Sequence, residues 1–73
     1  MKRREFVKLW ADTVAEGRKQ HHPDMRPSEI AASRISDEES GVRHWNKHRR
    51  AWAAMTVAQA SEALTGYTKE VQQ

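Results

Sequence analysis

The amino-acid sequence predicts an all-α fold, a small domain of three helices or of four. Apolar residues recur at intervals of three and four along the first part of the chain, which is the period of an α-helix. Two later segments carry residues that are typical of helix starts. The chain shows no run of alternating apolar and polar residues, the pattern of a half-buried strand.

The first predicted helix runs from about Lys2 to Lys19. Its apolar residues fall at i, i+3, i+4, i+7 and i+8, and are Phe6, Leu9, Trp10, Thr13 and Val14. Pro23 disfavours the α conformation at His22, so we expect the helix to end there. A polar linker should then extend to Arg26.

A second and shorter helix is predicted to begin at Pro27. Proline is tolerated in the first turn of a helix, and the acidic Glu29 is favourable there. We expect about two turns, with a short buried face formed by Ile30, Ala31 and Ile35.

The third predicted helix begins at a capping box. Ser36 can cap the first backbone N–H groups while Glu39, three residues later, reaches back to the cap. The helix should continue at least to Met55 despite Gly41. The continuous apolar face favours one long basic helix that extends to Leu64.

A fourth helix is the alternative at the C-terminal end. Thr56 and Gln59 have the spacing of a second capping box, so a separate helix could begin there and end near Gly66. Under both interpretations we expect residues 67–73 to form a flexible tail.

The composition predicts one domain, residues 1–73, with a thin core. Leu, Ile, Val and Phe number only ten among 73 residues, although three tryptophans add apolar surface. A chain this short usually needs disulfides, a metal or a partner to rise above marginal stability. Little apolar material is left for anything but the core.

Several functional classes are excluded. The absence of cysteine rules out disulfides, thiol catalysis and thiolate zinc sites. No apolar run approaches the roughly 20 residues of a membrane span. The size rules out a multi-lobed enzyme. We therefore expect a basic binding module in the cytoplasm, not an enzyme, without a cofactor or a membrane partner.

The segment between Ser40 and Ser61 holds no acidic residue. On a helical wheel Arg43, Lys47 and Arg50 share one face, and Trp45 and Trp52 lie opposite. This arrangement predicts tryptophans directed inward and cations directed outward.

Arg49 is the exception, because the wheel places it among the tryptophans. Three interpretations stay open for it: stacking on an indole ring, snorkelling to solvent, or meeting an acidic group of a partner. For the basic face as a whole, clustered cations without acids are typical of a surface that binds nucleic acid or acidic protein. The alternative is a solvated face on a protein with a net charge of +3.

A helix-turn-helix is a further interpretation. Residues 28–32 resemble a first helix and residues 42–45 resemble a recognition helix. The glycine that is usual in the turn is missing at residues 34–36. The three acids at 37–39 would also repel phosphate at the start of the recognition helix.

The N-terminal residues 1–5 are expected to form a basic arm. Lys2, Arg3 and Arg4 place positive charge at a helix N-terminus, where it opposes the helix dipole. Their retention indicates an anionic partner.

His44 and His48 have the i, i+4 spacing of two metal ligands. No accompanying carboxylate stands in the H-E-x-x-H arrangement, and neighbouring cations would repel a metal ion. We therefore predict no metal site. No catalytic triad and no glycine-rich phosphate loop is present in the sequence either.

In size, charge and layout the chain resembles the very small proteins with which lytic phages redirect host RNA polymerase, including transcription antitermination factors. The resemblance rests on the basic segment that leads into a helix at residues 1–10 and on the basic helix at residues 43–50. It implies RNA polymerase as the partner and the host cytoplasm as the location.

Three hypotheses follow. The first is a regulator that docks on RNA polymerase, the second a helix-turn-helix DNA-binding protein, and the third a helical protein-interaction module without a nucleic-acid role. The oligomeric state stays open. The predicted partner- or nucleic-acid-binding residues are Lys2, Arg3, Arg4, Arg43, His44, Lys47, Arg49 and Arg50.

Overall fold

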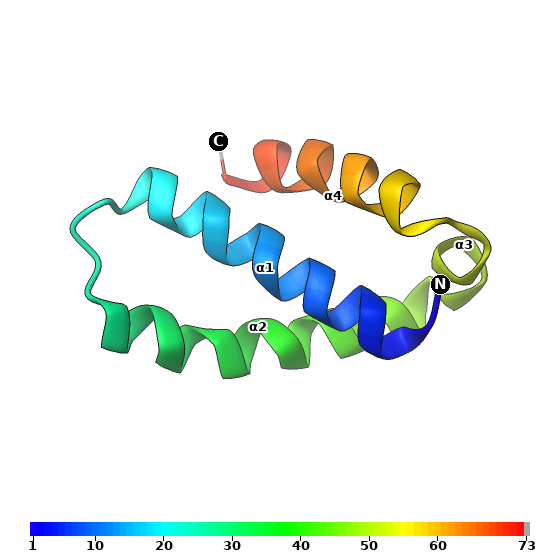
Figure 1. Ribbon diagram of the computed structural model, residues 1–73, viewed down its shortest axis with the longest axis horizontal. Coiled ribbons are helices and arrows are strands. Elements are labelled where there is room, and N and C mark those ends of the chain that lie inside the picture. The colour runs from blue at the N-terminus through cyan, green and yellow to red at the C-terminus, as the bar shows by residue number, and fades with distance from the viewer. Residues whose placement is uncertain (73) are drawn as a thin grey trace.

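The computed structural model describes residues 1–72, and the side chains of residues 1–66. The described part of the chain contains four α-helices and no strand, which confirms the all-α prediction (Figure 1). The helices are α1 (Arg3–His21), α2 (Pro27–Lys47), α3 (Arg49–Ala54) and α4 (Val57–Gln72).

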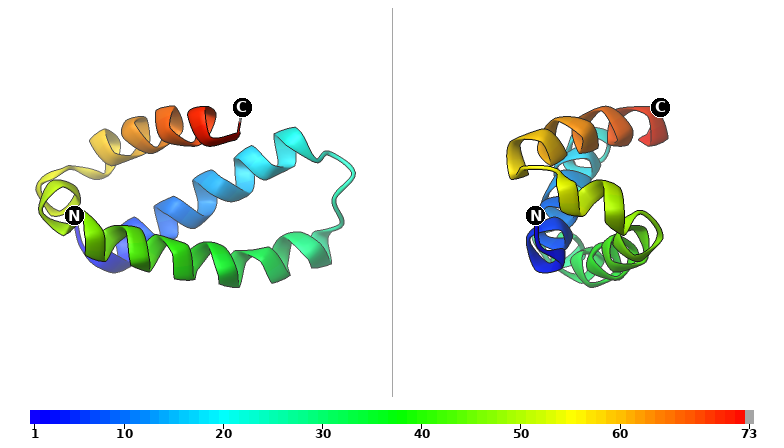
Figure 2. Two further views of the ribbon diagram at one scale, coloured as in Figure 1. Left: turned by 180° about the vertical axis from the view of Figure 1, so that it is seen from behind. Right: turned by 90° about the vertical axis from the view of Figure 1, so that its right-hand side faces the viewer.

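The central element of the fold is α1. It packs against α2 on one side and against α4 on another (Figures 1 and 2). The short α3 connects the end of α2 to the start of α4. The molecule is elongated, with principal extents of 37 × 21 × 18 Å. No helix in the described part of the chain is long and apolar enough to cross a membrane.

The first helix forms where the sequence predicts it. α1 ends at His21, and the next backbone N–H, that of His22, still donates to the carbonyl oxygen of Arg18 at 2.8 Å. Arg3 and Arg4 belong to its first turn, so the expected arm of residues 1–5 is helical from Arg3 onward.

The predicted boundary inside the second helix is wrong. α2 starts at Pro27 as expected, but it continues without interruption for 21 residues instead of two turns. Ser36 therefore lies inside the helix and caps nothing. No proline interrupts the segment, and Asp37 and Ser40 bond to α1 side chains, so packing on α1 overrides the local cap signal.

The expected buried face of this helix is also wrong. Ile30 is half-buried, but Ala31 is exposed and Ile35 is 66 % exposed. The buried residues of α2 are instead Asp37, Gly41 and Trp45.

The long basic helix is not formed. The chain breaks at His48, whose φ and ψ of −125° and 32° leave the α region, and again at Met55, which is extended. The break at His48 turns α3 so that Trp52 as well as Trp45 packs on Phe6. Burial of a second tryptophan compensates for the helical hydrogen bonds lost at the break.

The alternative fourth helix is confirmed. The backbone N–H of Thr56 donates to Gln59 Oε1 at 3.0 Å, and the N–H of Gln59 donates to Thr56 Oγ1 at 3.2 Å. This is the reciprocal capping box that the sequence predicts. The helix passes Gly66, its expected end, and continues to Gln72, while Gln73 lies outside the described residues.

The core is a small aromatic cluster around the fully buried Phe6. The centroid of its ring lies 4.7 Å from that of Trp52, 5.5 Å from that of Trp45 and 6.0 Å from that of Trp10. α4 adds two fully buried side chains, Ala60 and Leu64. The inward direction predicted for Trp45 and Trp52 is therefore confirmed.

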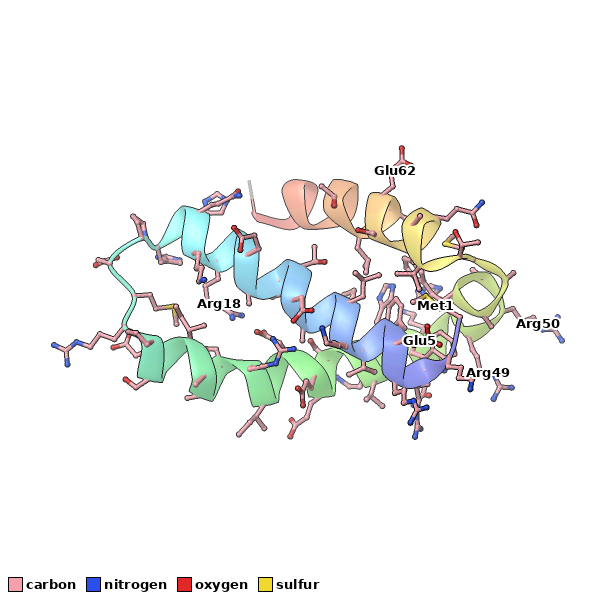
Figure 3. The ribbon with its side chains drawn as sticks, viewed as in Figure 1. Met1, Glu5, Arg18, Arg49, Arg50 and Glu62 are labelled. Carbon is pink, nitrogen blue, oxygen red and sulfur yellow. The ribbon has the colours of Figure 1, made fainter. Side chains whose placement is uncertain are left out.

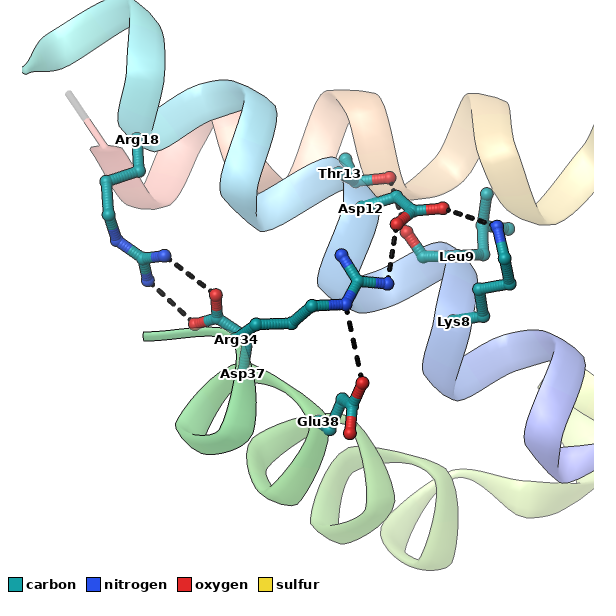
Figure 4. Close-up of polar contacts among 8 residues, drawn as sticks. All are labelled: Lys8, Leu9, Asp12, Thr13, Arg18, Arg34, Asp37 and Glu38. Carbon is teal, nitrogen blue, oxygen red and sulfur yellow. Dashed lines mark hydrogen bonds and ion pairs between the residues drawn. The ribbon is translucent and has the colours of Figure 1, made fainter. Parts of the chain in front are cut away.

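Two contacts fix α1 against α2. Arg18 donates two hydrogen bonds of 2.7 Å to the carboxylate of Asp37, which is only 5 % exposed (Figure 4). The bonded carboxylate raises the pKa of the Arg18 guanidinium. The indole N–H of Trp10 donates to Ser40 Oγ at 2.9 Å, so the polar edge of a buried ring is satisfied.

Candidate partner-binding surface

The structure brings the predicted cations together at one end of the molecule. Phe6, one turn into α1, lies with its ring against His44 near the end of α2 and against Trp52 in α3. The amino group of Met1 donates to the carbonyl oxygen of Ala53 at 2.8 Å. The start of α1, the end of α2 and all of α3 therefore share this end (Figures 1 and 3).

We call this surface the basic end. All seven of its cations are exposed, and Arg49 and Arg50 extend away from the helices (Figure 3). Among residues 1–5 and 43–55 the one acid is Glu5, whose carboxylate accepts the backbone N–H of Lys2 at 3.3 Å. The members of the basic end are Lys2, Arg3, Arg4, Arg43, Lys47, Arg49 and Arg50.

An open hollow of about 690 Å³ lies at the junction of α2 and α3. It forms because the chain turns at His48, and it is lined by Asn46, Lys47, His48, Arg49, Arg50 and Ala51. Three cations thus border one concave surface, which suits a protruding anionic group of a partner. Asn46 is not predictable as part of this surface from the sequence, because no proline or glycine marks the break.

The predicted face of Arg43, Lys47 and Arg50 is only partly formed. Arg43 and Lys47 remain one turn apart on α2, but the break transfers Arg50 to α3. Arg49 does not project among the tryptophans, because the same break leaves it exposed. Of the interpretations left open for Arg49, snorkelling to solvent and meeting an acidic group of a partner are both compatible with this exposure.

His44 occupies a different environment from the one expected. It is half-buried, and its ring lies 4.6 Å from the Trp10 ring and 6.0 Å from the Phe6 ring, stacked on both. Burial lowers the pKa of the His44 imidazole, and the nearby charges of His48 and Lys47 lower it further. His44 therefore packs its ring against the aromatic core while part of it stays exposed, and its predicted place in the partner-binding surface stays a prediction.

The histidine pair forms no recognisable metal site. The rings of His44 and His48 lie 4.8 Å apart. Within the described residues no group of three or more histidines or carboxylates is placed to hold a metal ion. Two imidazoles beside several cations make a poor cation site.

The geometry does not contain the helix-turn-helix that the sequence suggested. Residues 28–45 lie in one uninterrupted helix, so the turn between the two proposed helices is absent. Asp37, expected at the start of a recognition helix, is instead buried against Arg18.

Comparison with known proteins adds no relative from which residue roles can be transferred. The basic end, the hollow at its junction and the aromatic core are therefore interpreted from their own geometry. No protein-family model, curated protein or solved structure matches this chain.

Proposed function

We propose that this protein is a transcription-regulatory binding module that docks on RNA polymerase through the basic end. The observation that carries the proposal is the convergence of seven exposed cations from three separate segments on one end of an 8.5 kDa chain. The likeness in size and layout to small phage regulators supports the choice of polymerase. The geometry itself supports an anionic partner surface.

Electrostatics explains why such an end suits docking. Like charges concentrated on one surface create a local potential that accelerates association with an oppositely charged partner. The same concentration costs stability, since the cations repel one another and three of them oppose the dipole of α1. A surface that costs stability without stabilising the core is typical of a binding site.

The uninterrupted α2 favours a protein partner over groove insertion. Helix-turn-helix proteins place the start of a recognition helix against base edges. Here the cations lie at the end of α2 and in α3, and the start of α2 carries Glu29. Contact with phosphates through the basic end is the second candidate, because arginine-rich surfaces without acids also bind nucleic acid.

Binding to purified bacterial RNA polymerase tests the proposal. The affinity tag belongs at the C-terminus, because the amino group of Met1 bonds to the carbonyl oxygens of Ala53 and Met55. We expect retention of polymerase at moderate salt. Replacement of Arg49 and Arg50 by glutamine should weaken binding by about tenfold or more.

The matched control removes two exposed cations from the opposite end of the molecule, Lys19 and Arg26. The Lys19→Gln, Arg26→Gln variant has the same net charge as the Arg49→Gln, Arg50→Gln variant. It should bind polymerase like the unaltered chain. Equal loss in both variants would show an unspecific charge effect, and absence of binding in the unaltered chain would refute the polymerase assignment.

Titration with duplex and single-stranded DNA separates the two candidates. Contact with phosphates predicts an affinity that falls linearly with salt on logarithmic axes, with a slope set by the number of cations engaged. Tight DNA binding without polymerase binding would favour the nucleic-acid candidate.

A further inference from the structure

The flank formed by α1 and α2 carries an apolar hollow and an exposed apolar side chain side by side. The hollow has a volume of about 280 Å³ and lies between the two helices. Its lining residues are Ala15, Lys19, Pro27, Ile30, Ala31 and Arg34. Ile35 stands one helical turn from Ala31 on the same flank and is 66 % exposed.

Ion pairs hold the two walls of this hollow in place. Arg34 of α2 donates to Asp12 of α1 at 2.7 Å and lies 3.4 Å from Glu38 (Figure 4). Hydrogen bonds from Lys8 and Arg34 lower the pKa of Asp12, so the carboxylate stays charged at neutral pH. The walls are therefore formed before any partner arrives.

We propose that the occupant of this flank is a second copy of the same chain, paired about a twofold axis with its α2 antiparallel to the first. In this pairing Ile35 of each copy enters the hollow of the other. The hollow is larger than the roughly 150 Å³ that accommodates a benzene-sized group, so one branched side chain fits. A twofold contact requires one surface to be self-complementary, and a projecting side chain beside a hollow meets that requirement.

The charges along α2 fit the same register. An antiparallel pairing that sets Ile35 opposite Ala31 of the second copy sets Glu39 opposite Pro27 and next to Arg26. Both side chains are exposed, so each can reach the other without losing a bond within the described residues. The twofold axis repeats this pair, which gives two identical ion pairs, one at each edge of the contact.

Dimer formation leaves the proposed function intact. The contact is centred on the first half of α2, whereas the basic end lies at its last turn and in α3. An antiparallel pair therefore exposes its two basic ends at opposite extremes. The inference does not rest on polymerase binding and can fail or succeed without it.

Sedimentation equilibrium of the full chain between about 5 and 500 µM tests the proposal. The unaltered chain should rise from its monomer mass of 8.5 kDa toward twice that mass. Ile35→Glu should weaken dimerisation at least about 100-fold, because each dimer loses two buried isoleucines and gains two buried charges. Val57→Glu, at an apolar position 48 % exposed on α4, is the matched control and should dimerise normally.

A charge exchange tests the register. Glu39→Lys and Arg26→Glu should each weaken the dimer by about tenfold, and the double variant should recover most of the affinity. Circular dichroism confirms that each variant keeps its helices, which is expected because all substituted positions are exposed. The proposal is overturned if the unaltered chain stays monomeric throughout, if Ile35→Glu associates normally, or if the double variant fails to recover.

Discussion

Individual side chains decide how closely α1 and α2 approach. A Cβ atom on Gly41 would lie 2.9 Å from Cδ1 of the Trp10 indole, a distance that real Cβ contacts do not show. Trp10 cannot move away easily, because it is buried and its N–H is bonded to Ser40. The absence of a side chain at Gly41 therefore allows α2 to approach Trp10 closely, although glycine lowers the helix propensity of α2.

Replacement of Gly41 by alanine should destabilise the protein relative to replacement of Gly66 by alanine. Both glycines lie inside helices, so both variants gain about 1 kcal/mol of helix propensity. At Gly66 nothing lies within 4 Å of the added methyl group, so that variant should be stabilised. The difference in unfolding free energy, measured in urea, isolates the steric cost and should be about 1–3 kcal/mol. Equal stabilities would mean that α1 and α2 have room to separate.

His44 should make the stability depend on pH. Its pKa is lowered in the folded state by burial, so below the ordinary histidine value the unfolded chain binds more protons than the folded one. Stability is therefore complete above about pH 6.5 and falls as the pH decreases toward the lowered folded pKa.

Urea midpoints at about pH 7.5 and pH 5.5 measure this effect. In the His44→Gln variant the urea midpoint should change little between the two pH values. The His48→Gln variant, which replaces an exposed imidazole, should keep most of the change seen in the unaltered chain. A flat profile in the unaltered chain would contradict the assigned shift.

The elements differ in what defines their ends. α1 ends and α4 begins on a local signal, a proline after α1 and the capping box before α4. The end of α2 and the start of α3 have no such signal, because the break between them lies at His48, where the sequence carries no helix breaker. The packing of Trp45 and Trp52 on one phenylalanine decides that break.

Thr56→Ala tests the local signal at α4. Loss of the hydroxyl that accepts the N–H of Gln59 should lower the unfolding free energy by about 1 kcal/mol. Thr56→Ser keeps the hydroxyl and should lower the unfolding free energy much less than Thr56→Ala. If the two variants were equally stable, the capping bond would contribute nothing in solution.

In the molecule as a whole, the side chains that stabilise the fold and the exposed cations form two distinct groups. Most of the buried apolar side chains form one aromatic cluster, and seven exposed cations project at the end of the molecule where that cluster lies. This concentration of charge predicts a measurable cost to stability. Self-repulsion among surface charges is strong at low salt and is screened within about 10 Å at 0.1 M.

Removal of Arg3 and Arg4 by glutamine substitution should therefore raise the stability at low salt. Both residues lie in the first turn of α1, where positive charge opposes the dipole, at a cost of a few tenths of a kcal/mol each. In thermal melts the variant should have a higher melting temperature than the unaltered chain at low salt, and the difference should disappear as salt is added. A loss of stability at low salt would indicate that the two arginines have structural partners.

The all-α class, the position of α1, the start of α2 and the cap of α4 were all predictable from the sequence. So were the inward direction of the tryptophans and the outward direction of Arg43, Lys47 and Arg50. Each of these depends on neighbours within about one helical turn, such as a proline, a capping pair or an apolar residue one turn away. The chain itself therefore determines them.

The tertiary structure decided the rest. It placed Asp37 against Arg18, which removed the cap expected at Ser36, and it ended α2 at His48 so that two tryptophans could pack on Phe6. It also stacked the His44 ring on Trp10 and gathered cations of three segments at one end. These features depend on residues far apart in the chain, whose mutual burial and pairing outweigh the fraction of a kcal/mol that separates local conformations.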